Sequence, residues 1–99
     1  MAFIYHVTTK QEWETAMLKG YYTVPTLESE GFIHCCAEEQ VNGVLERYYA
    51  GKKDLVKLVI DTGKLISGLK YELAPSVNEH FPHVYGPINL DAVLHVEMI

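Results

Sequence analysis

The residues of this chain best suited to chemistry are its histidines, two of which interrupt apolar, strand-like stretches. His6 lies in "FIYHV" and His34 in "GFIHCC". An imidazole changes charge near neutral pH, so it can transfer a proton or hold a ligand. Because alternate residues of a strand share one face, His6 is grouped with Thr8, and His34 with Cys36. If the two strands are neighbours, both histidines converge on one cleft; otherwise each is a core or edge residue bonded to backbone.

A second group of rings and imidazoles lies in residues 80–87, "HFPHVYGP". Its prolines and glycine predict an ordered loop of defined shape that presents His83 and Tyr85. The alternative is a loop that packs its own rings over a sheet edge. The spacing of His80 and His83 is compatible with a metal site, but Pro82 prevents a regular helix there. No zinc-binding motif occurs, and no metal is expected.

Acid–base or glycosidic chemistry would require carboxylates near these histidines, and Glu30 is the best placed. It adjoins Gly31 at the entrance to the strand that carries His34. The remaining candidate acids are scattered, as expected of a solvated surface: Glu28, Glu72 and Glu79. No glycine-rich phosphate-binding loop is present.

The two cysteines, Cys35 and Cys36, are adjacent, so in a strand they point to opposite faces and a mutual disulfide would be strained. Either could in principle pair with a histidine as a nucleophile, but Cys35 shares the face of Ile33, where a small hydrophobe is expected. Cys36 precedes "AEEQ" and is predicted to be a helix N-cap. Both are expected to be free thiols in a reducing cytosol.

The elements that must position these residues alternate between strands and helices at first and are mainly strands later, which predicts an α+β fold. Thr9 and Glu12 form a capping box before a helix that Gly20 should end. Residues 21–30 and 74–87 are predicted to be loops. The expected strands cover residues 3–7, 32–36, 54–61, 69–73 and 91–99, and the expected helices cover 10–19 and 37–51.

Length and charge limit the function. The 99 residues predict a single domain, 1–99, with 48% hydrophobic content and a net charge of −5. With Arg47 as its one arginine, the chain is not expected to bind nucleic acid. No secretory signal or membrane-spanning segment is recognisable, so a cytoplasmic protein is expected. The oligomeric state does not follow from the sequence.

Four blocks of the chain resemble the signature of a known family: "IYHVT", "EGFIHCCAEEQV", "DLVKLVID" and "FPHVYGPINLDAV". The sequence is identified by them as a member of domain of unknown function 952, whose members usually have serine at Cys36. That family is grouped by fold with the ADP-ribosyltransferase superfamily. The resemblance implies a compact split β-sheet with short helices that clamps NAD between the sheet halves.

The resemblance also implies roles for individual residues. His6 in "YHVT" is similar to the first-strand histidine that touches a ribose of NAD, and Val7 stands where glycine is usual. His34 in "FIHCC" is similar to the second motif of the superfamily. Asp91 falls near the third motif, which is commonly a glutamate or an arginine.

We therefore expect an ADP-ribosyltransferase-like enzyme that acts on NAD or a related nucleotide as substrate, with no resident cofactor. The expected catalytic residues are His34, Glu30 and Asp91, and the expected nucleotide-binding residues are His6, Thr8, His83 and Tyr85. Two alternatives remain open: a non-catalytic module that binds a nucleotide or sugar-phosphate, and a small protein-interaction domain that uses exposed aromatics.

Overall fold

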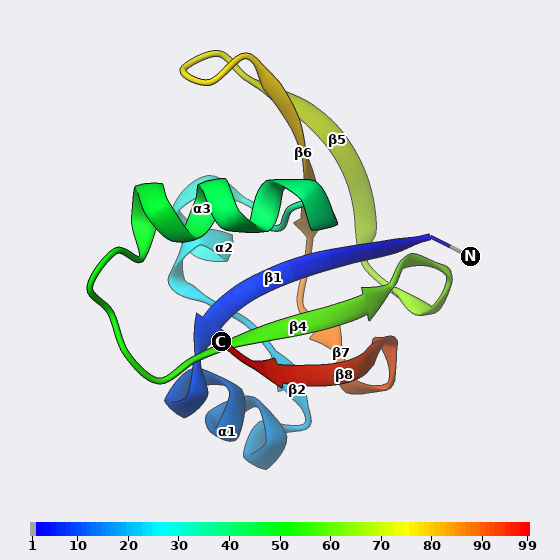
Figure 1. Ribbon diagram of the computed structural model, residues 1–99. Helices are drawn as coiled ribbons and strands as arrows, with labels where there is room; N and C mark the ends of the chain where they lie inside the picture. The colour runs from blue at the N-terminus through cyan, green and yellow to red at the C-terminus, as the bar shows by residue number, and fades with distance from the viewer. Residues whose placement is uncertain (1) are drawn as a thin grey trace.

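Short helices and strands alternate along the chain in a computed structural model that describes residues 2–99 (Figure 1). The α+β class predicted from the sequence is confirmed. In chain order the elements are β1 (Phe3–Thr9), α1 (Lys10–Lys19), β2 (Tyr21–Tyr22), α2 (Pro25–Glu30), β3 (Ile33–His34), α3 (Val41–Tyr48), β4 (Leu55–Asp61), β5 (Gly68–Ala74), β6 (Glu79–Tyr85), β7 (Ile88–Asn89) and β8 (Val93–Met98). Single-turn helices cover Glu38–Gln40, Thr62–Lys64 and Leu90–Ala92.

The strands form three small antiparallel sheets, in the orders β1-β4-β8, β2-β7 and β3-β6-β5. The first and third sheets are joined where Tyr5 and Cys36 exchange backbone hydrogen bonds of 2.8 and 2.7 Å. The β5–β6 hairpin extends past the other strands, and its turn lies at the top of Figure 1. The two histidine-bearing segments are therefore neighbours, as their convergence on one cleft requires.

Helix α1 has the ends that its sequence predicts. The Thr9 hydroxyl accepts a hydrogen bond from the Glu12 backbone N–H at 3.1 Å. Gly20 ends the helix with a φ of 91°, and its N–H donates to the Ala16 carbonyl at 2.8 Å. These bonds satisfy backbone groups that a helix terminus leaves unpaired, so both termini are fixed locally.

Residues 21–30 are not the predicted loop, because they form β2 and α2. Pro25 stands at the start of α2, where its missing N–H removes no helical hydrogen bond. Gly31 ends the helix with a φ of 88°. Tyr22 pairs with Ile88 of β7, which anchors this segment in the core.

The helix predicted over residues 37–51 is shorter than expected, since a single turn precedes α3 and α3 ends at Tyr48. Cys36 is not the N-cap, because its backbone is paired with that of Tyr5. The cap residue of the turn is Ala37, whose N–H donates to Gln40 Oε1 at 2.8 Å. A pairing between distant segments replaces the local cap that the sequence indicated.

The segment 74–87 is also not a loop: Glu79–Tyr85 is the central strand of its sheet, β6. Its register places Pro82 beyond the end of β3, where the Cys35 N–H donates to the Pro82 carbonyl at 3.0 Å. The missing proline N–H therefore costs the ladder at most one bond. Asn78 makes the tight turn from β5 with a φ of 54°.

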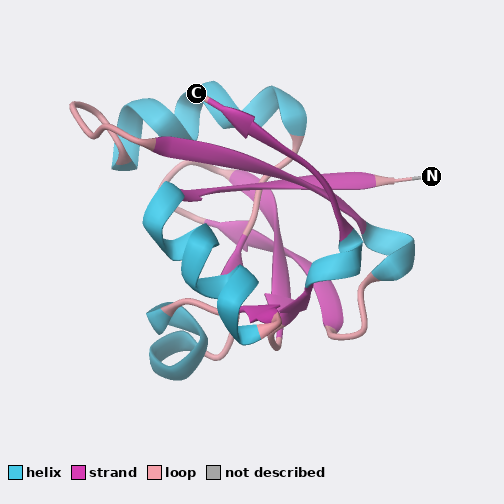
Figure 2. Ribbon diagram, turned by 90° about the horizontal axis from the view of Figure 1, so that it is seen from below, coloured by secondary structure: helices cyan, strands magenta, loops and turns pink. Residues whose placement is uncertain are grey.

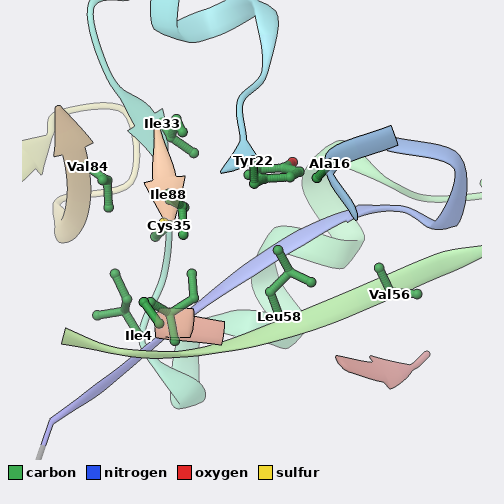
Figure 3. Packing of buried hydrophobic residues seen from close by; sticks show 11 residues of the cluster. Ile4, Ala16, Tyr22, Ile33, Cys35, Val56, Leu58, Val84 and Ile88 are labelled. Atoms are coloured by element: carbon green, nitrogen blue, oxygen red, sulfur yellow. The ribbon is translucent and has the colours of Figure 1, made fainter. Parts of the chain in front are cut away.

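The apolar core lies where the three sheets meet. Figure 3 shows Ile33, Val84 and Ile88 together, with Leu58 of β4 and Tyr22 of β2 close by. These side chains come from all three sheets, so the core fixes how the sheets are arranged. Viewed from below, the helices lie around the outside of the strands (Figure 2).

Candidate functional site

A cleft of about 700 Å³ opens between β1, the short strand β3 and helices α2 and α3. Its lining is mainly aromatic and aliphatic, with polar groups that include three imidazoles and two carboxylates. The lining includes Tyr5, His6, Thr8, Glu12, Tyr22, Thr26, Glu30, His34, Tyr48, Tyr49, Phe81 and His83. A volume in the range of ~300–1,000 Å³ is typical of small-molecule sites.

Two of the imidazoles, those of His34 and His83, face each other on one wall. The register of β3 and β6 places these residues directly opposite, so their side chains share one face of the sheet. Their ring centroids are 5.2 Å apart. Phe32 stacks on His83 at 4.0 Å and meets His34 edge-on at 4.7 Å. The phenyl ring therefore limits the movement of both histidines.

His34 is a surface residue of the cleft and not a core histidine. Its Nε2 donates a hydrogen bond to Glu30 Oε2 at 3.2 Å, and the two side chains are 51% and 47% exposed. Glu30 is the last residue of α2, and β3 begins three residues later. The Gly31 turn thus brings the carboxylate and the imidazole to the same edge of the cleft.

His83 has a different carboxylate partner. Its Nδ1 donates to Glu72 Oε1 at 2.8 Å, across the β5–β6 pair. The Tyr85 hydroxyl donates to the same oxygen. These bonds, the one from Tyr85 first and then the one from His83, lower the pKa of the Glu72 carboxyl. The cleft wall therefore has two histidines, each hydrogen-bonded to its own glutamate.

His6 is the satisfied core histidine of the chain. Its Nδ1 lies 2.5 Å from the His34 carbonyl oxygen, to which it must donate, and its Nε2 accepts from the Tyr22 hydroxyl at 2.7 Å. Burial lowers the pKa of His6 to about 4, so the ring is neutral at pH 7. With both nitrogens bonded internally, His6 supports the His34 backbone and has no free nitrogen for a ribose.

The low pKa of His6 predicts a loss of stability as the pH falls. An unfolded His6 binds a proton at about its usual pKa of 6.5, whereas the folded one resists protonation to about 4. Its contribution is complete above pH 6.5 and is lost progressively below, by about 2 kcal/mol at pH 5. Denaturant unfolding at pH 7.5 and 5 should show this loss in the wild type.

The matched variant is His6→Gln, which has a donor and an acceptor but no titrating group. The difference in unfolding free energy between the wild type and this variant isolates His6 from the other titrating side chains. Equal pH dependence in both proteins would contradict a neutral, buried His6.

Glu12 also lines the cleft, and two hydroxyls hold its carboxylate. Its Oε1 accepts from Thr8 at 2.9 Å and from Thr9 at 3.2 Å. Thr26 Oγ1, also at the cleft, is a buried polar atom without a hydrogen-bond partner in residues 2–99. A buried hydroxyl without a hydrogen-bond partner is uncommon in folded proteins.

The cysteines are not activated nucleophiles. Both are buried and free. Burial raises the pKa of Cys36 to about 11 and raises the pKa of Cys35 further. Thiols with raised pKa values stay protonated at neutral pH, and only the thiolate is a good nucleophile. We therefore assign both to packing.

Most of the predicted site residues lie at the cleft, but two do not. Asp91 lies in the turn between β7 and β8 and accepts a hydrogen bond from Asn89 Nδ2 at 2.6 Å. It does not line the cleft, because that turn leads the chain into β8 at the far edge of the first sheet. Tyr85 is held by Glu72 and is also not in the lining.

Glu72, Glu12 and Tyr22 were not among the site residues predicted from the sequence, where Glu72 was considered only as one of the scattered acids of a solvated surface. Glu72 and Lys70 alternate with apolar residues in the predicted strand 69–73, but the partner strand was predicted to be a loop, which hid the contact with His83. Tyr22 also fell in a predicted loop. The capping box identified Glu12 only as a helix residue, although it also lines the cleft.

Within residues 2–99 no group of three or more histidine, cysteine, aspartate or glutamate side chains is arranged to hold a metal ion. None of the helices in this described part of the chain is long and apolar enough to cross a membrane.

The structure thus defines a small α+β protein with a histidine-lined cleft between its sheets. Residues 7–96 match the family described as Protein of unknown function (DUF952), and the chain belongs to that family. No curated protein sequence matches it.

The chain is similar to solved structures of protein CC0527 from Caulobacter crescentus, a structural genomics target. Its crystal structure is 28% identical, has a TM-score of 0.86, and the match covers 96% of this chain and 83% of that one. The solution NMR structure of the same protein is 29% identical with a TM-score of 0.81, covering 97% and 83%. These matches support the fold along nearly the whole chain.

Proposed function

We propose that this protein binds NAD or a related nucleotide in the histidine-lined cleft and breaks its N-glycosidic bond, as an ADP-ribosyltransferase-like enzyme. The observation that carries the proposal is the Glu30–His34 pair at the edge of the cleft, with a 3.2 Å hydrogen bond. Such chemistry requires a carboxylate near the ribose. The sequence indicated both Glu30 and Asp91 for this role, and of the two only Glu30 lines the cleft.

In the proposed reaction, the bond between ribose C1′ and the nicotinamide nitrogen breaks, and both electrons leave with nicotinamide. The ribose then develops positive charge, which a nearby carboxylate stabilises. Glu30 would provide the negative charge that stabilises the ribose, and His34 would hold the Glu30 carboxylate in place. The tyrosines of the lining, among them Tyr48 and Tyr49, offer rings for stacking on a base.

The charge of the cleft supports a cationic ligand group. Among the described residues, the carboxylates that line the cleft are those of Glu12 and Glu30, and no lysine or arginine is in the lining. His6 is neutral there because of its lowered pKa. The nicotinamide ring of NAD⁺ is positively charged and would be attracted by these two carboxylates, whereas its pyrophosphate would be repelled by them and would extend toward solvent.

A non-catalytic nucleotide-binding module is the second candidate. It is favoured by the 47% exposure of the Glu30 side chain, because a solvated carboxylate stabilises a developing charge less than a dry one. A protein-interaction domain would instead use the exposed apolar residues of β8, which are Leu94, Val96 and Met98.

An NMR titration of the ¹⁵N-labelled protein with NAD, followed by an assay of nicotinamide release, tests the proposal. We expect chemical-shift changes at His34, His83 and Phe32, and release of free nicotinamide. Shifts without release would favour the binding module. No shifts at millimolar NAD would contradict the nucleotide proposal altogether.

A further inference from the structure

The carboxylate of Glu72 fixes which nitrogen of His83 carries the proton. Its Oε1 accepts from His83 Nδ1 at 2.8 Å, and the Tyr85 hydroxyl bonds to the same atom. Because hydrogen bonds lower the pKa of Glu72, this carboxyl is an acceptor only and requires an N–H at Nδ1. In neutral His83 the Nε2 atom is therefore unprotonated and able to accept a proton.

The sheet directs this imidazole to the cleft. His83 lines the cleft, and its side chain is 11% exposed. Within residues 2–99, its Nε2 makes no hydrogen bond that would occupy the lone pair, and Phe32 is stacked on the ring at 4.0 Å. A histidine with a carboxylate on one nitrogen, a ring fixing its plane and the other nitrogen free has the arrangement of a general base.

We propose that His83 is the general base for the acceptor of the ribosyl group, and that Glu72 is the positioning residue that holds it. This inference rests on the proposed function. As nicotinamide leaves C1′ with the bonding electrons, an acceptor hydroxyl or water forms the new C1′–O bond. Its proton passes to His83 Nε2, and the resulting imidazolium is stabilised by Glu72. His34 and Glu30 act on the donor, whereas His83 and Glu72 act on the acceptor.

Several charged or titratable groups face His83 from the elements packed against it. Lys70 and Glu72 come from β5, with Lys70 directly opposite His83 in the register. His34 faces it from β3, with its ring centroid 5.2 Å away. From β6 itself, Tyr85 bonds to Glu72, and Lys70 Nζ lies 5.1 Å from the Tyr85 ring. The carboxylate that contacts His83 directly is that of Glu72.

The test combines His83→Asn with Glu72→Gln in the whole protein. Asparagine places an N–H donor near the position of Nδ1 but has no base at the position of Nε2. We expect His83→Asn to lower kcat for nicotinamide release from NAD about 100-fold with little change in KM. The decline of the wild-type rate at low pH, caused by protonation of Nε2, should be absent in this variant.

Glu72→Gln should alter the imidazole itself. In the free wild-type protein, ¹⁵N NMR should show the Nδ1-protonated tautomer of His83, and Glu72→Gln should shift it toward the Nε2-protonated form and lower kcat. Glu79→Gln is the matched control. Glu79 lies on the same hairpin, and its Oε1 accepts a hydrogen bond from Gln40 Nε2 at 3.2 Å. It does not line the cleft.

The proposed function and the role of His83 as the base can be contradicted separately. If the wild type releases nicotinamide while His83→Asn keeps its rate and pH profile, His83 is not the base and only this inference is wrong. The Nε2-protonated tautomer in the wild type would overturn it equally. If the wild type releases no nicotinamide, the proposed function fails and the inference fails with it.

Discussion

Replacement of Glu30 by glutamine is expected to reduce nicotinamide release by about 100- to 1,000-fold while NAD still binds. Glutamine has nearly the same shape, so the cleft and its aromatic lining are unchanged. It lacks the negative charge that would stabilise the ribose cation, and its effect should therefore appear in kcat more than in KM. The measurements are single-turnover rates and an NMR or calorimetric titration of the variant.

The control is Glu28→Gln, on the same helix α2. Glu28 is exposed and does not line the cleft, so its variant should keep the wild-type rate. If Glu30→Gln retains full activity, the carboxylate that serves the site is a different one, and Glu12 would be the next to test. If Glu30→Gln loses binding and rate equally, its role is to hold the ligand.

Replacement of His6 by alanine should produce the largest loss of stability, about 3–4 kcal/mol in the free energy of unfolding. The substitution removes two hydrogen bonds and leaves the buried Tyr22 hydroxyl and the His34 carbonyl without these partners. It also leaves a cavity where the ring packs edge-on against Tyr22 at 5.1 Å. Urea unfolding at pH 7.5 measures the change.

His95→Ala is the comparison for this variant, because His95 is exposed on β8. It should cost less than about 0.5 kcal/mol. His6→Gln, which can donate to the carbonyl and accept from the Tyr22 hydroxyl, should recover part of the stability. A His6→Ala cost as small as that of His95→Ala would show that the two hydrogen bonds contribute little, and His6 would again be a candidate ligand residue.

The local signals in the sequence were reliable where the structure depends on local chemistry. The Thr9–Glu12 cap, the Gly20 stop and the apolar strand at residues 54–61 all lie where predicted, within one or two residues. Glu30, at the entrance to the β3 segment, was recognised from its sequence position next to Gly31. These features depend on backbone groups and side chains a few residues apart, which a single sequence displays directly.

The roles of the histidines could not be predicted from such local signals. His6 and His34 occupy similar positions in similar strand-like stretches, yet one is fully bonded in the core and the other is half exposed beside Glu30. The difference arises from Tyr22, which reaches His6 from a segment predicted to be a loop. A buried polar group forms its hydrogen bonds with whichever partner the fold brings to it, and the spacing of residues in the sequence does not identify that partner.

The sequence by itself determined an α+β chain, the ends of its first helix and the set of residue types available to a site. The tertiary structure alone decided that β6 is a strand, because Pro82 lies beyond the end of β3 where its missing N–H is tolerated. The strand β6 places His83 opposite His34, and it places His83 Nδ1 2.8 Å from Glu72 Oε1. Pro82 and the prolines and glycine around this segment disfavoured a strand locally, and pairing on both sides, which only the complete fold provides, outweighed them.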